Sequence, residues 1–125
     1  IKIDDYLDIN SIQVFGNLNI SADSQLFINS QHTSTKTTQT VYSLPSISSI
    51  GDQIFISSGI GGLGGFRINQ TANQQILGNV NNSTIGATGY IQSTSNVYSI
   101  SLKCIEANLK WIVQSISPSV IITVV

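Results

Sequence analysis

The sequence has 125 residues, which is enough for one domain with a modest core and too few for two. Only 9% of the residues are charged and the formal net charge is −1, so the chain lacks the basic surface that binding to nucleic acid or to an anionic membrane requires. No apolar run is long enough for a transmembrane helix, so we expect no membrane insertion. Hydrophobic residues make up 41%, and most of the remainder is Ser, Thr, Asn and Gln, which favours an extracellular or virion-surface protein.

The first half of the chain contains a succession of strand patterns, and apolar residues rarely recur at the i, i+3, i+4, i+7 spacing of a helix. Gly16-Asn17 is expected to form a bulge or turn, and the polar run 31–40 to connect two strands. Gly51-Asp52 is a turn pair that leads into the next strand. The expected strands of this half are residues 1–9, 11–20, 25–30, 40–45 and 50–59.

Residues 59–65 form a segment with five glycines in seven residues. The segment fits the letters of the dinucleotide-binding pattern G-x-G-x-x-G, but a strand pattern follows instead of the helix whose N-terminus would hold a pyrophosphate. We therefore interpret it as a structural turn. Residues 66–70 and 74–80 are expected to pair as a hairpin, in which Asn73 tolerates the left-handed conformation of a tight turn.

The last third of the chain alternates between apolar and polar residues more clearly than the rest. Tyr98 and Cys104 share one apolar face and Trp111 lies on another, so all three are expected in the core. The expected elements are a loop at residues 81–89, strands at residues 97–107, 109–116 and 120–125, and turns at residues 106–108 and 117–119. Short strands with turns between them predict an all-β fold, an antiparallel β-sandwich or jelly-roll-like domain.

The sequence contains no set of residues that is typical of a catalytic or metal site. His32 is the only histidine, and no second ligand lies beside it, so neither zinc binding nor a Ser-His-Asp triad is expected. Asp4, Asp5 and Asp8 form the only acidic cluster, which we interpret as a solvated strand end because a calcium site requires more oxygen ligands. We expect no enzyme activity, metal or cofactor. Tyr90, in a Gly-containing loop, is the aromatic residue that we single out for contact with a ligand.

Two of three neighbouring glutamines lie where the expected hairpin calls for apolar residues. Gln70 and Gln74 share faces with core-type side chains, and Gln75 adjoins them. A buried amide without a hydrogen bond costs about 1–3 kcal/mol. Around a threefold axis, copies of one glutamine can donate to one another in a closed ring, which makes Gln70, Gln74 and Gln75 candidates for a trimer interface. Alternatively, the hairpin is a sheet edge and the amides face water.

A series of motifs runs in order from Val41 to Val113. A Leu-Pro…Gly-Asp entry to a strand precedes a glycine-rich turn, then an aromatic, a basic and an apolar residue followed by Gln, a Gln-x-Ile strand and a Cys-x-x-Ala-Asn-x-x-Trp-x-Val ending. The residues are Leu44-Pro45, Gly51-Asp52, 61–65, Phe66, Arg67, Ile68, Gln70, Gln74, Ile76, Cys104, Ala107, Asn108, Trp111 and Val113. This pattern resembles the C-terminal β-domains of trimeric phage tail fibres and of bacterial and viral collagen-like surface proteins. Phe66 replaces a more usual Trp and Asn73 a common Gly, and residues 1–40 and the C-terminal end depart from the pattern.

The resemblance implies that the single domain, residues 1–125, has a fibre-like core at 41–125 and N-terminal strands at 1–40 that are available to a neighbouring subunit. It implies an intertwined homotrimer without enzymatic activity. Such a trimer would cap an extracellular or virion-surface fibre and bind a receptor, commonly a cell-surface glycan. The alternative is a structural subunit of an extracellular filament, in which residues 1–14 or 120–125 add as a strand to the next subunit.

Overall fold

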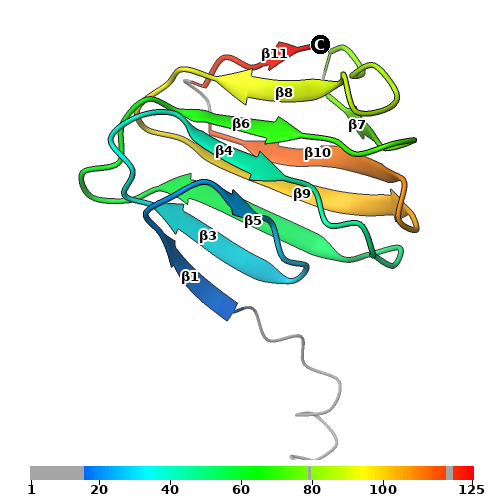
Figure 1. The fold of residues 1–125 in the computed structure, drawn as a ribbon, viewed down its shortest axis with the longest axis horizontal. Helices are drawn as coiled ribbons and strands as arrows, with labels where there is room; N and C mark the ends of the chain where they lie inside the picture. The colour runs from blue at the N-terminus through cyan, green and yellow to red at the C-terminus, as the bar shows by residue number, and fades with distance from the viewer. Residues whose placement is uncertain (1–15, 79, 118–119) are drawn as a thin grey trace, which may run out of the picture.

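Alternating apolar and polar residues form short strands along the chain. The computed structural model describes residues 16–78, 80–117 and 120–125, and the strand expected at residues 1–9 lies outside them. The strands are β1 (Gly16–Ile20), β2 (Ser24–Gln25), β3 (Ser30–Ser34), β4 (Thr40–Ser43), β5 (Gln53–Ser58), β6 (Phe66–Asn69), β7 (Gln75–Leu77), β8 (Tyr90–Ser93), β9 (Ser99–Glu106), β10 (Lys110–Ile116) and β11 (Thr123–Val124). None of the described residues is helical, so the prediction of an all-β fold is confirmed (Figure 1).

The strands form two sheets, which we call sheet A and sheet B. Sheet A has the order β1-β3-β5-β9-β10-β7, and sheet B has the order β11-β8-β6-β4-β2. From β1 to β9 the chain crosses to the other sheet after every strand. As a result, β1, β3 and β5 are parallel neighbours in sheet A, and β2, β4 and β6 are parallel neighbours in sheet B. The pairs β1-β2, β3-β4 and β5-β6 are thus three successive turns of a two-sided coil (Figure 1).

The C-terminal strands add antiparallel pairings to this coil. β9 and β10 form an antiparallel hairpin, β9 also pairs antiparallel with β5, and β8 does so with β6 and β11. Both sheets are therefore mixed, whereas we expected antiparallel sheets. The reason is that most connections cross between the sheets instead of turning back within one of them. Alternation of apolar and polar residues does not distinguish these two kinds of connection. This strand order does not confirm a jelly-roll connectivity.

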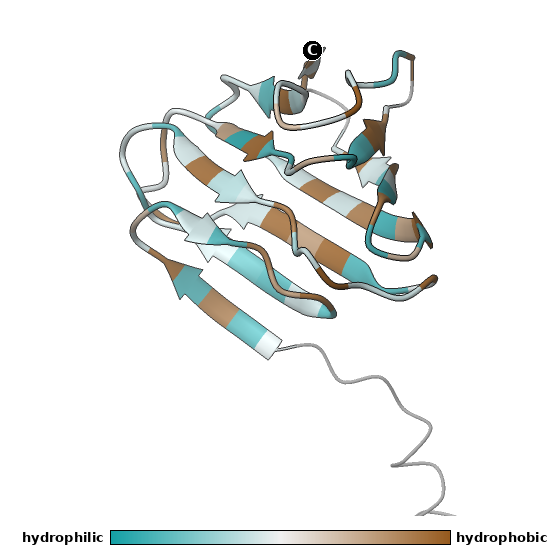
Figure 2. Ribbon diagram, turned by 45° about the vertical axis from the view of Figure 1, so that its right-hand side comes forward, coloured by the Kyte–Doolittle hydropathy of each residue, from teal (hydrophilic) through white to brown (hydrophobic). Residues whose placement is uncertain are grey.

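Apolar side chains from both sheets meet in one core between them. The long strands carry alternating brown and pale bands in Figure 2, as expected for strands with one buried face. Tyr98, Cys104 and Trp111 are buried in this core, as predicted from the alternation. Tyr98 packs against Phe66, with 4.8 Å between the ring centroids. Because Phe66 belongs to β6 of sheet B and Cys104 and Trp111 to sheet A, the core joins the two sheets.

The prediction of a hairpin between residues 66–70 and 74–80 is wrong. β6 pairs with β4 and β8 in sheet B, whereas β7 pairs with β10 in sheet A. The segment between them crosses from one sheet to the other, although Asn73 has the predicted left-handed conformation, with φ of 68°. The sequence correctly indicated a tight turn at Asn73, but the turn does not bring its two flanking strands together.

The N-terminal strands also differ from the expectation. Residues 26–29, placed in a strand by their apolar character, form the turn between β2 and β3, and Asn29 has φ of 53°. The polar run, expected to be a connection, begins with β3, which lies between β1 and β5. Gly16-Asn17 belongs to β1 instead of a turn, and the final strand is reduced to β11. Polar strands were missed here because Ser and Thr face both the core and the solvent.

Two predicted glycine turns are confirmed. Gly51 has φ of 96° in the turn before β5. Residues 59–65 connect β5 to β6, and Gly65 in this connection has φ of 74°. A Cβ atom on Gly65 would overlap the carbonyl oxygen of Ser93 on the neighbouring strand, so this position requires glycine for both conformation and space.

Candidate functional site

Gln70 is buried inside the chain, where its amide joins the crossing segment to the loop before β8. Its Nε2 lies within hydrogen-bonding distance of three carbonyl oxygens, those of Gln74 (2.7 Å), Thr84 (2.8 Å) and Gly86 (3.0 Å). Its Oε1 accepts the Ile76 main-chain N–H at 3.2 Å and the Ser83 hydroxyl. The amide is therefore satisfied without a second subunit.

Gln74 and Gln75 also find their partners within the chain. Gln74 is buried, its Oε1 accepts the Thr71 N–H at 2.8 Å, and its Nε2 donates to the carbonyl oxygens of Pro45 (2.8 Å) and Asn108 (3.3 Å). Gln75 is half-buried and donates to the Ser83 carbonyl oxygen at 3.0 Å. These amides neither form an exposed edge nor require a symmetry axis, so they no longer argue for a trimer, and the trimer itself stays a prediction.

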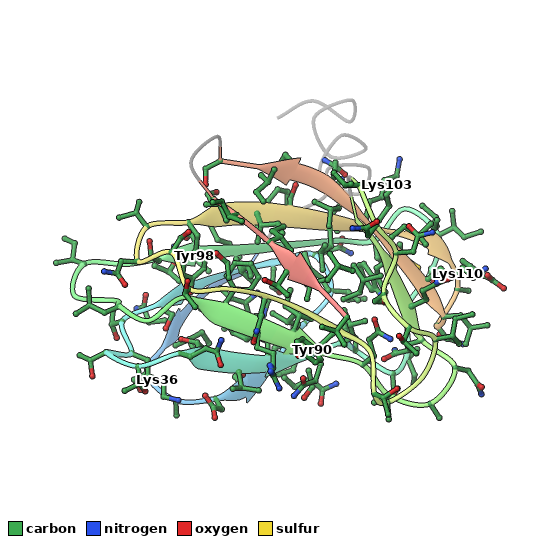
Figure 3. The ribbon with its side chains drawn as sticks, turned by 90° about the horizontal axis from the view of Figure 1, so that it is seen from above. Lys36, Tyr90, Tyr98, Lys103 and Lys110 are labelled. Carbon is green, nitrogen blue, oxygen red and sulfur yellow. The ribbon has the colours of Figure 1, made fainter. Side chains whose placement is uncertain are left out.

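Tyr90 lies at the first position of β8, not in a loop, and its side chain is half-buried on the outside of sheet B. Figure 3 shows Tyr90 and Lys103 on opposite sides of the sandwich. The Arg67 guanidinium covers one face of the Tyr90 ring, with Cζ 3.8 Å from the ring centroid. This cation–π contact means that Tyr90 positions Arg67 and offers less of its ring to a ligand.

Outward side chains form two rows across sheet B. Strand register places Val41, Arg67, Gln92 and Thr123 in one row, and Ser43, Asn69 and Tyr90 in the other. Tyr90 exchanges two backbone hydrogen bonds with Val125, which extends the second row. The alternate residues of these strands are buried or pack against the core. We call this set the sheet B face: Val41, Ser43, Arg67, Asn69, Tyr90, Gln92, Thr123 and Val125.

Arg67 is the single charged residue of the sheet B face. Its Nε–H donates to Gln92 Oε1 at 3.0 Å. Gln92 Oε1 also accepts from Gln39 Nε2 at 3.4 Å. Because an arginine N–H can only donate, the Gln92 atom that faces it must be the oxygen, and the Gln92 NH₂ group points away from Arg67.

The nearest ion pair along this side of the molecule is already complete. Asp23 Oδ1 lies 2.6 Å from Lys36 Nζ and also accepts the Val41 N–H at 2.9 Å. The hydrogen bond from Lys36 is the main cause that lowers the pKa of the Asp23 carboxyl, followed by that from Val41. The Asp23 carboxylate is thus engaged, and the sheet B face keeps a positive charge.

His32 is fully buried beneath sheet A and acts as a structural residue. Its Nε2 accepts the Phe27 main-chain N–H at 3.0 Å, so the proton lies on Nδ1, which donates to the Phe55 carbonyl oxygen at 3.1 Å. Burial lowers the pKa of His32 below its usual value, although the hydrogen bonds of the imidazole to the backbone of Phe55 and Ser30 oppose this. Both ring nitrogens of the neutral imidazole are occupied, which argues against a role as a metal ligand or a general base.

A shallow apolar groove lies where the β2–β3 and β4–β5 connections meet. Its volume is about 240 Å³, and the residues that line it are Gln25, Leu26, Phe27, Ile28, Pro45, Ser46 and Ile47. Phe27 and Ile47 are 52% and 79% exposed, and the Phe27 ring stacks on His32 with 6.2 Å between centroids. With few polar groups, the groove offers contact area but little chemical selectivity.

Within the described ranges, no three His, Cys, Asp or Glu side chains gather closely enough to hold a metal ion. The same part of the chain contains no helix with the length and apolarity to cross a membrane. Asp4, Asp5 and Asp8 lie outside the described residues.

Comparison with known proteins finds no family model that matches the chain and no curated protein with significant sequence similarity. The resemblance to tail-fibre domains therefore rests on the ordered motifs alone. Of the residues selected from the sequence, only Tyr90 lies in the sheet B face. Arg67, Asn69 and Gln92 were missed as site residues, although the buried Phe66 and Ile68 on either side of Arg67 already indicate that it points outward.

Proposed function

We propose that this protein is a non-enzymatic domain of an extracellular or virion-surface fibre, and that it attaches to a cell-surface glycan through the sheet B face. The observation that carries this proposal is a row of hydroxyls, amides and one guanidinium on the outer side of sheet B. The side-chain amide of Asn69 and the NH₂ group of Gln92 have no hydrogen-bond partner among the described residues. Such groups match the donors and acceptors of sugar hydroxyls.

The absence of catalysis in this proposal is supported by how the ionisable side chains are used. His32 is buried with both nitrogens engaged. Asp23 pairs with Lys36, and Glu106 lies 3.6 Å from Lys110. Asp52 accepts from Asn29 and from the Ser49 N–H, which closes the turn before β5.

We propose a homotrimer as the working assembly, with the domain as the cap of the fibre. Its support is the resemblance together with large apolar side chains that a lone subunit leaves in water. Ile47 and Ile50 are 79% and 72% exposed at one end of β5, and Ile60 is fully exposed at the other. Light scattering should then give a constant mass near three times 13.4 kDa over a roughly hundredfold concentration range.

A glycan array tests attachment through the sheet B face. We expect the wild-type protein to bind a subset of glycans and Gln92→Ala to lose that binding. Gln31→Ala is the matched control because Gln31 is exposed on β3 of sheet A. Absence of binding to any glycan, or equal binding by both variants, would overturn the proposal.

A filament subunit is the second candidate, and the open sheets favour it. β1 and β7 end sheet A, and β2 and β11 end sheet B, so each sheet offers edges to which a strand from another copy could add. Strand addition produces open polymers, so a mass that grows with concentration would support the filament over the closed trimer.

A further inference from the structure

Among the residues that the structure describes, Arg67 has no counter-ion. It is the only arginine of the sequence. The ion pairs among the described residues are Lys36–Asp23 and Lys110–Glu106, and neither includes Arg67. Its side chain is half-buried in the middle of the sheet B face. A partly desolvated cation attracts an anion more strongly than a fully hydrated one does.

The guanidinium is held in place before any ligand arrives. The Tyr90 ring supports its flat side at 3.8 Å, and Gln92 Oε1 accepts from its Nε–H at 3.0 Å. These contacts leave the N–H groups of the two terminal nitrogens without a partner in the described part of the chain. Two parallel N–H donors on a fixed plane match the two oxygens of a carboxylate.

The surroundings of Arg67 also favour an acceptor-rich group. Gln92 turns its NH₂ group away from Arg67, and Asn69, the register partner of Tyr90, has a side-chain amide without a partner among the described residues. No side chain of the sheet B face carries a carboxylate, and Asp23 is engaged by Lys36. A neutral sugar would leave the guanidinium unmatched, whereas an acidic sugar supplies the missing charge.

We infer that the glycan bound by the sheet B face is acidic, with a sugar carboxylate held in two hydrogen bonds by Arg67. This inference rests on the proposed function and specifies its ligand class. Gln92 and Tyr90 are positioning residues that keep the guanidinium plane fixed, and Asn69 binds a neighbouring hydroxyl.

The experiment compares charged and uncharged forms of the same sugar. The probes are trigalacturonic acid and sialyllactose, each compared with its own methyl ester and titrated into ¹⁵N-labelled protein. Because Arg67 is the only arginine, its Nε–H gives a single side-chain resonance of this type. We expect at least one of the two acids to shift this resonance and to bind roughly tenfold or more tightly than its neutral counterpart.

Two variants separate a specific site from general attraction of anions. Arg67→Gln and Lys103→Gln each remove one positive charge, and Lys103 is exposed on the opposite side of the sandwich (Figure 3). Arg67→Gln should abolish the preference for the acid, and Lys103→Gln should leave it within about twofold. Arg67→Lys keeps the charge but lacks the planar pair of donors, so it should recover only part of the affinity.

The outcomes are distinguishable. Three results would overturn the inference of an acidic ligand. They are equal affinity for an acid and its neutral counterpart, an equal loss of affinity in Arg67→Gln and Lys103→Gln, and no binding of either acid. In each of these cases, array binding that still depends on Gln92 would preserve the proposed function. If no glycan binds at all, the proposed function fails and the inference fails with it.

Discussion

Replacing Gln70 with leucine separates an internal structural role of this amide from a role at a subunit interface. Leucine has a similar volume, so the main effect is the loss of hydrogen bonds. Ile76 N–H retains the Ser83 hydroxyl at 2.8 Å, but the Thr84 carbonyl oxygen loses its one partner among the described residues. One unsatisfied carbonyl and several weakened contacts predict a loss of about 2–4 kcal/mol in the free energy of unfolding. For a domain of this size, that corresponds to a melting temperature lower by roughly 10 °C.

Urea unfolding followed by the fluorescence of Trp111 measures this loss. Trp111 is the only tryptophan and is fully buried, so its emission reports on the core. Gln75→Leu is the matched control, because Gln75 is half-buried and makes a single hydrogen bond; it should cost about 1 kcal/mol or less. If Gln70→Leu cost no more than Gln75→Leu, the internal network would not stabilise the fold. A loss that grew on roughly hundredfold dilution would place Gln70 at an interface instead.

Three further predictions concern single positions. Burial lowers the pKa of His32 from its ordinary 6.5, so the unfolded chain binds a proton at this residue more readily than the folded chain does. The free energy of unfolding should therefore fall as the pH drops below about 6.5. His32→Gln should remove that dependence in denaturation curves between about pH 7 and pH 5. Gly65→Ala should unfold the protein or lower the free energy of unfolding by at least about 3 kcal/mol, because its Cβ would overlap the Ser93 carbonyl oxygen. Gly51→Ala has open space around its Cβ and should cost only the conformational strain of about 1–2 kcal/mol. Equal losses of stability in calorimetry would contradict the overlap at Gly65. Asn108→Gly keeps the left-handed turn but loses the acceptor for the Ser48 N–H, so we expect the free energy of unfolding to fall by about 1 kcal/mol. Asn108→Ala loses the same acceptor and also disfavours the positive φ, so it should cost more. The reverse order would show that the positive φ does not determine stability at this position.

The sequence was sufficient to predict the all-β class and most of the strands after Thr40, because their apolar residues alternate. Cys104 and Trp111 were placed in the core for the same reason. The turns at Gly51, Asn73 and Asn108 were predicted because few other residues adopt a positive φ.

Strand pairing and the polar strands could not be predicted in the same way. β3 contains only Ser, Gln, His and Thr, and its inward side is occupied by His32 and by Ser34, whose hydroxyl lies 2.7 Å from that of Thr40. A strand whose buried side chains are polar shows no alternation of apolar and polar residues in the sequence. Burial of the Gln70 amide was one of two alternatives that the sequence left open, and its partners lie up to sixteen residues away, in a loop whose position depends on the tertiary fold.

The position of Arg67 on an outer face could be predicted from its neighbours in the sequence. Its lack of a counter-ion among the described residues could not be predicted. That property depends on Asp23 being engaged by Lys36 and on Glu106 pairing with Lys110 in sheet A. Net charge alone, at −1, points away from an anionic ligand. The local arrangement of charges therefore carries information that the total does not.

The two-sided coil of β1 to β6 also gives the domain a way to change length. Each turn of the coil adds one parallel strand to both sheets and, within the coil, pairs only with the turns beside it, as in solenoid proteins. A related chain with an additional turn before β1 would widen the sheet B face beyond Gln25, while β6 and β8 would stay unchanged. A chain without β1 and β2 would also lack Asp23, and Lys36 would lose its ion-pair partner. Insertion or loss of whole turns would thus adjust the width and charge of the face independently of the residues at its centre.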